Sequence, residues 1–226
     1  MDLLQFINSL PQPPYCERVS DSLFSEPINL ITNLAFFVSA FFVYKIIKAS
    51  NLKNSIYNFF PWIIFAIGLG SSLWHLYRNP VTLIFDALPV YIFLGLALFV
   101  LIKKLIGNSK QALVIIGLFI LLQILLTINF PDLLNNSIRH IANAVLLLVL
   151  IVWTYKKFGN VALQLIFVLL IYVVGIFFRA IDMSVCPAFG IGTHFLWHIL
   201  VALGAYFIVK FLVFSLSRDA GNCLST

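Results

Sequence analysis

Three of the four histidines in this chain have the positions needed to share one metal ion. His194 and His198 stand four residues apart in a long apolar stretch, so they project from one face of a helix. His75 ends another apolar stretch and can supply a third ligand. Three imidazoles with one open position for water form a catalytic zinc arrangement. A histidine pair alone also occurs on helix faces that bond to neighbouring helices, so the metal prediction depends on His75.

Two further polar residues lie near His75 in the sequence. Ser71 precedes it by four residues, so it either faces the same cavity or packs as a small residue. Asp86 follows a turn that contains Asn79 and Pro80, inside the next apolar stretch. A carboxylate within a membrane span costs at least about 2.5–3.5 kcal/mol and marks a functional site. Asp86 could orient a histidine, bind the metal or act as a general base.

The elements that must position these residues are membrane-spanning helices. The chain has 226 residues, of which 62% are hydrophobic and 10% charged, and a mean hydropathy of +1.06, too apolar for a water-soluble domain. About twenty apolar residues cross a hydrocarbon core, and seven such stretches occur, at 28–48, 57–77, 81–102, 111–129, 138–155, 161–178 and 193–214. We predict an all-α membrane protein with a seven-transmembrane helix bundle.

The predicted bundle occupies residues 28–214, between an outer interfacial lead-in segment, 1–27, and a cytoplasmic tail, 215–226. His140 has no partners like those of the other histidines. Because it stands beside Arg139 at the start of a predicted span, we expect it at the membrane interface.

The basic residues predict the orientation. Ten of the fourteen lysines and arginines fall on the side that receives the C-terminus: Lys45, Lys48, Lys53, Lys103, Lys104, Lys110, Lys156, Lys157, Lys210 and Arg218. By the positive-inside rule the C-terminus is cytoplasmic and the N-terminus outside. The net charge is +6, but the basic residues flank the predicted spans and do not cluster on a soluble face. The charge therefore does not indicate nucleic-acid binding. All acidic residues except Asp219 fall on the outer side, which fits either a cation site or ordinary loop solvation.

Three blocks of residues together resemble the alkaline ceramidase family, which belongs to the wider group of seven-helix hydrolases that includes the adiponectin-receptor-like proteins. They cover about residues 15–200 and are Tyr15-Cys16-Glu17 with Glu26-x-x-Asn29-x-x-Thr32-Asn33, Ser71-x-x-x-His75 with Asp86-Ala87-Leu88-Pro89, and Asp182-x-x-x-Cys186 with His194-Phe195-Leu196-Trp197-His198.

The resemblance implies zinc bound by the three histidines, Ser71 near the oxyanion and Asp86 handling protons during amide hydrolysis. It also implies a calcium ion nearby, for which the matching ligands are Glu17, Glu26 and the Tyr15 carbonyl. The sequence departs from the family pattern at Pro14 and Val19, where the family has Asp and Asn, and Asp21 could compensate. Ala87 replaces a residue that is acidic in many members, which bears on the substrate.

The family motifs also carry cysteines at the positions of Cys16 and Cys186, which implies a disulfide between them. The predicted topology places both on the outer side, and Cys223 alone in the cytoplasmic tail, where thiols stay reduced. The bond would close a loop of about 170 residues, contribute at most about 5 kcal/mol, and hold the lead-in over the mouth of the site. The alternative is two buried, unpaired cysteines.

The predicted function is a zinc-dependent intramembrane lipid amide hydrolase, which releases a fatty acid from ceramide or a related N-acyl lipid. Alternatives are a glycerolipid ester hydrolase with the same site and a seven-helix receptor with a structural metal. A retinal photoreceptor using Lys210 and Asp86 leaves the three histidines unexplained. The short loops and the Lys/Ile/Phe/Asn-rich composition favour a bacterial inner membrane over a eukaryotic endomembrane.

Overall fold

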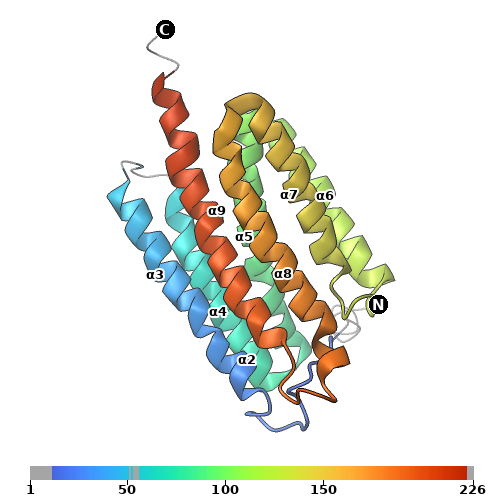
Figure 1. Ribbon diagram of the computed structural model, residues 1–226. Coiled ribbons are helices and arrows are strands. Elements are labelled where there is room, and N and C mark those ends of the chain that lie inside the picture. The colour runs from blue at the N-terminus through green and yellow to red at the C-terminus, as the bar shows by residue number, and fades with distance from the viewer. Residues whose placement is uncertain (1–11, 51, 53–55, 223–226) are drawn as a thin grey trace.

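The computed structural model describes residues 12–50, 52 and 56–222, and all regular structure in these residues is helical (Figure 1). The elements are α2 (Pro27–Thr32), α3 (Leu34–Ala49), η1 (Ile56–Phe59), α4 (Phe60–Tyr77), α5 (Pro80–Ile106), α6 (Ser109–Asn129), α7 (Ile138–Phe158), η2 (Gly159–Ala162), α8 (Leu163–Val185) and α9 (His194–Asn222).

Six segments of the described chain are long and apolar enough to cross a membrane. Five of them correspond to single predicted spans. The sixth, Ile138–Val185, is 48 residues long and joins α7 to α8 through the short η2 turn. The prediction of an all-helical chain with several helices able to span a membrane is therefore confirmed for the described residues. The two predicted spans at 138–155 and 161–178 are connected without a gap in helical structure, and α7 and α8 lie side by side (Figure 1).

Two helices, α8 and α9, extend furthest beyond the predicted spans. α8 ends at Val185, so Arg179 and Asp182, expected in a loop, lie in its last turns. Both are buried in the protein, at 4% and 0% exposure, so their polar groups are shielded from lipid. α9 continues to Asn222, into the predicted tail.

Large apolar side chains cover the outside of the bundle. Examples are Trp62 on α4, Leu118 on α6 and Leu170 on α8, which are 71%, 63% and 58% exposed. Such a surface is stable only against an apolar solvent, so it agrees with the membrane assignment.

A two-residue turn places α4 and α5 side by side. Arg78 ends α4 in a left-handed conformation, with φ 46°. Asn79 then caps α5, because its Oδ1 accepts hydrogen bonds of 3.0 Å from both the Val81 and Thr82 amides. The turn brings Asp86 alongside the helix that carries His75.

A close contact between these helices fixes their separation. Pro89 has no N–H to donate to the carbonyl of Phe85, four residues earlier in α5. That carbonyl faces Gly70 on α4, where a Cβ atom would collide with it. Only glycine allows this approach, and the next residue in α5 is Asp86.

Candidate functional site

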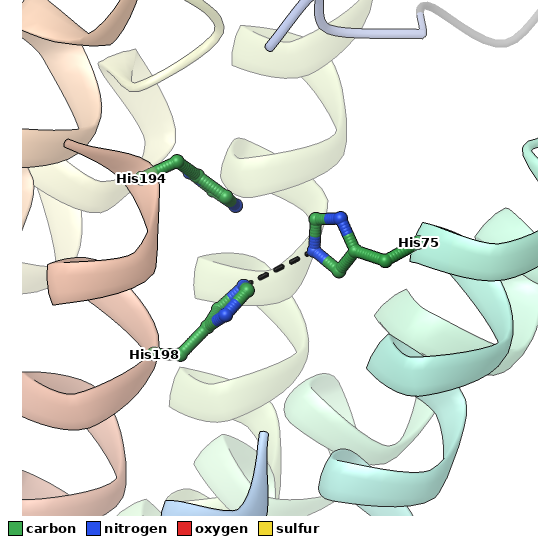
Figure 2. A group of neighbouring side chains, drawn as sticks. All are labelled: His75, His194 and His198. Carbon is green, nitrogen blue, oxygen red and sulfur yellow. Dashed lines mark hydrogen bonds between the residues drawn. The ribbon is translucent and has the colours of Figure 1, made fainter. Parts of the chain in front are cut away.

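Three buried histidine side chains converge between α4 and the start of α9, as Figure 2 shows. His75 is 1% exposed, His194 2% and His198 3%. One nitrogen from each ring lies within 4.8 Å of the other two. Of the described residues, these three form the group of potential ligands close enough to hold one metal ion.

The outer nitrogens of two rings are held by oxygen atoms. Nδ1 of His75 lies 2.6 Å from Oε2 of Glu26, and Nδ1 of His198 lies 3.1 Å from Oγ1 of Thr32. The Thr32 hydroxyl donates to the Ile28 carbonyl at 2.8 Å, so its oxygen accepts from His198. If both Nδ1 atoms carry the proton, both Nε2 atoms present lone pairs.

Those two Nε2 atoms face one another at 3.1 Å (Figure 2). Two lone pairs at this distance repel each other unless a cation lies between the rings. Nitrogen ligands of one tetrahedral zinc ion are about 3.4 Å apart, close to this spacing. Three buried imidazoles, two of them with hydrogen-bonded outer nitrogens, are a donor set that zinc favours, so the residues fit the predicted metal.

The third ring, His194, is held by packing. Tyr15 stacks on it with ring centroids 4.0 Å apart. Nδ1 of His194 is buried and has no hydrogen-bond partner in the structure. The ring therefore keeps an unsatisfied polar atom in the cluster, which is typical of a site that binds a further group.

Asp86 and Ser71 line one cavity together with the three histidines. The cavity has a volume of about 100 Å³, enough for several water molecules. The Ser71 side chain lies near the Asp86 carboxylate and interacts with it. The structure thus brings a carboxylate and a hydroxyl to the same cavity as the histidines.

The lead-in is fastened over this cavity by two kinds of bond. Cys16 and Cys186 form the expected disulfide, with Cα atoms 5.4 Å apart. Asp182 connects the same segments, because Oδ2 accepts from the Cys16 amide at 2.9 Å. Its Oδ1 accepts from the amides of Thr193 at 2.7 Å and His194 at 2.9 Å. Asp182 therefore sets where α9 begins relative to the lead-in.

The residues proposed for calcium have other partners in this structure. The Tyr15 carbonyl accepts from the Arg18 amide at 3.2 Å. Glu17 accepts from the Ile28 and Asn29 amides at 2.6 and 2.8 Å, at the N-terminus of α2, and Asp21 is exposed. Burial raises the pKa of the Glu17 carboxyl, although both amides oppose that rise. Calcium binding by these residues stays a prediction.

Glu26 is surrounded by positive charge. Its Oε1 lies 3.0 Å from Nη1 of Arg18 and 3.8 Å from Nε of Arg78. Burial alone would raise the pKa of Glu26, but the hydrogen bond with His75 and the charge of Arg78 lower it below its ordinary value. The carboxylate stays ionised and acts as the partner of His75.

A second group of polar residues lines the same cavity and was not predicted as part of the site. Its members are Gln123, Arg139, His140, Asn143 and Arg179. The interfacial position expected for His140 is wrong: it is 8% exposed, packs on Trp197 with centroids 4.6 Å apart, and has Nδ1 3.0 Å from the Tyr172 hydroxyl. The sequence feature that could have indicated this group is Gln123, a polar amide in the middle of an apolar stretch.

The comparison with protein families agrees with this site. The Ceramidase family model matches residues 14–222, which include the lead-in from residue 14 onward, all three histidines and both cysteines of the disulfide. The chain belongs to the Ceramidase family. No curated protein matches the sequence significantly.

Proposed function

We propose that this protein is a zinc-dependent intramembrane hydrolase that cleaves the amide bond of ceramide or a related N-acyl lipid and releases a fatty acid. The observation that carries the proposal is the convergence of two imidazole Nε2 atoms at 3.1 Å, beside the third histidine and within one cavity with Asp86. Family membership supports a lipid amide as the substrate.

His75, His194 and His198 would hold the zinc ion. When bound, zinc supplies Lewis acidity, which activates water and polarises a carbonyl group. Asp86 accepts a proton from the attacking water at its carboxylate and returns it to the leaving amine. The Ser71 hydroxyl, which lies near Asp86, donates to the developing oxyanion; one such donor contributes about 2.7–4 kcal/mol in known enzymes.

We further propose seven membrane crossings, with an outer lead-in at 1–27, a membrane domain at 28–214 and a cytoplasmic end at 215–226. The 48 residues of Ile138–Val185 support two crossings, since one needs about twenty residues. The excess of lysine on one side supports a cytoplasmic C-terminus. A multi-pass protein of a bacterial inner membrane is the proposed location.

The decisive experiment uses purified protein in lipid nanodiscs, with its metal content measured by mass spectrometry. Ceramides and glycerolipid esters of matched acyl length are supplied, and released fatty acid is quantified. We expect about one zinc per chain, release from the amides, and loss of release after chelation. Faster release from the esters would favour the alternative ester hydrolase, and no release from either lipid would favour a receptor with a structural metal.

A further inference from the structure

The cavity lined by the three histidines also contains two arginines. Arg139 lies in the first turn of α7 and Arg179 in the last turns of α8. Both line the cavity that His75 and Asp86 also line. An arginine inside a membrane span is costly and normally faces a partner of opposite charge.

Neither arginine has such a partner in the described part of the chain. The ion pairs found there all involve Glu26, with Arg18, His75 and Arg78. Asp86 is the acidic residue among those that line the cavity, and it acts on both arginines only through space. Arg139 donates to the amide oxygen of Asn136, which is neutral.

Buried donors in this part of the cavity are also unsatisfied. Arg179 is 4% exposed, and its Nε has no hydrogen-bond acceptor. Gln123 is 1% exposed, and its Nε2 likewise has none. Two positive charges and unsatisfied N–H groups in one cavity are the arrangement that an anion would satisfy.

Aromatic rings lie between Arg179 and the histidine cluster. The guanidinium carbon of Arg179 lies 6.0 Å from the Tyr15 ring centroid and 5.6 Å from that of Trp197. Tyr15 in turn stacks on His194 at 4.0 Å. The Tyr15 ring therefore lies between Arg179 and His194, one of the proposed zinc ligands. At this separation, one lipid molecule can contact both the arginine and the metal site.

We infer that Arg139 and Arg179 form a subsite for an anionic headgroup, and that the preferred substrate is an acidic N-acyl lipid rather than neutral ceramide. Guanidinium groups bind phosphate and carboxylate in a bidentate manner, which a hydroxyl headgroup cannot match. The inference rests on the proposed hydrolase function and adds the charge of the substrate to it.

The test compares two lipids that differ only in charge, ceramide and its 1-phosphate with the same acyl chain. We expect kcat/KM to be at least about tenfold higher for the phosphate, and Arg179→Gln and Arg139→Gln to remove most of that preference by lowering kcat/KM more for the phosphate than for ceramide. Arg179→Lys keeps the positive charge but lacks the planar guanidinium group, so its preference for the phosphate should lie between those of the wild type and Arg179→Gln. Lys110→Gln, an exposed position, removes the same charge elsewhere and should match the wild type.

A binding measurement separates this inference from the hydrolase proposal. Thermal unfolding of the zinc-loaded protein is followed with hexadecyl phosphate, hexadecanol, palmitate or inorganic phosphate. If hexadecyl phosphate stabilises the wild type and Arg179→Gln abolishes this effect, the subsite is supported even when neither lipid is hydrolysed. The absence of hydrolysis would contradict only the hydrolase proposal.

Four results would overturn the subsite. Two concern hydrolysis: the wild type prefers ceramide, or the arginine variants lose kcat/KM equally for both lipids. Two concern binding: inorganic phosphate raises the unfolding temperature as much as hexadecyl phosphate does, or palmitate inhibits in an arginine-dependent way while the substrate preference is unchanged. The last would assign the arginines to the fatty-acid product.

Discussion

The carboxylate of Glu26 lies 2.6 Å from Nδ1 of His75, although 49 residues separate them in the chain. This bond fixes the ring so that Nε2 faces the other histidines. Outer partners of this kind contribute about 10- to 100-fold to metal affinity. We therefore expect Glu26→Gln to weaken zinc binding by about that factor, measured by competition with a chelator.

Glu17→Gln is the matched control for that variant. It removes a carboxylate from the same segment, but Glu17 bonds to backbone amides of α2 and not to His75. Its zinc affinity should stay near that of the wild type, even if the protein unfolds at a lower temperature. Equal zinc affinity in both variants would contradict the role given to Glu26.

Asp86→Asn should retain zinc and lose activity. Asparagine keeps the shape of the side chain, but it cannot act as a general base. General-base catalysis contributes about 10²–10⁴-fold, so a loss of kcat in that range is expected at unchanged metal content. Asp132→Asn, an exposed loop position, is the control. Turnover within a few-fold of the wild type would remove Asp86 from the mechanism.

Gly70→Ala should separate α4 from α5. Its methyl group would collide with the Phe85 carbonyl, so α5 must shift and carry Asp86 with it. We expect a destabilisation of about 1–3 kcal/mol and reduced kcat. Gly117→Ala on α6, with open space around it, should be neutral or stabilise by up to about 1 kcal/mol. A stable, fully active Gly70→Ala protein would show that the close contact does not position Asp86.

Reduction of the disulfide should loosen the lead-in. The Cys16–Cys186 bond holds the segment whose Tyr15 stacks on His194. The double variant Cys16→Ser, Cys186→Ser should have a lower melting temperature and a lower activity. The loss in free energy of unfolding should be smaller than the value of about 5 kcal/mol from the chain-entropy model. Labelling of both thiols in the oxidised wild type, before any reductant is added, would disprove the bond.

Calcium binding should depend on Arg18. A calcium ion ligated by Glu26 must displace the guanidinium of Arg18 from Oε1, 3.0 Å away, and calcium needs six to eight oxygen ligands. Arg18→Gln is expected to bind calcium more tightly than the wild type, whereas Arg18→Lys should not, as titration calorimetry would measure. The same weak response to calcium in both variants would rule out the site.

The sequence alone determined the membrane class and the three histidines. Length and hydropathy are properties of each stretch by itself, so the apolar stretches predicted the helices without knowledge of their neighbours. The four-residue spacing of His194 and His198 likewise follows from helix geometry. The family motifs supplied the cysteine pair, which the structure brings to 5.4 Å between Cα atoms.

Only the tertiary structure decided which side chains meet. Thr32 reaches His198 across 166 residues, Glu26 reaches His75, and Arg139 and Arg179 join the histidines in one cavity. The physical reason is that helices in lipid are apolar on every side, so hydropathy does not reveal which face of a helix turns inward. The inward faces are chosen by close contacts such as Gly70 against Phe85, which depend on how the helices pack around one another.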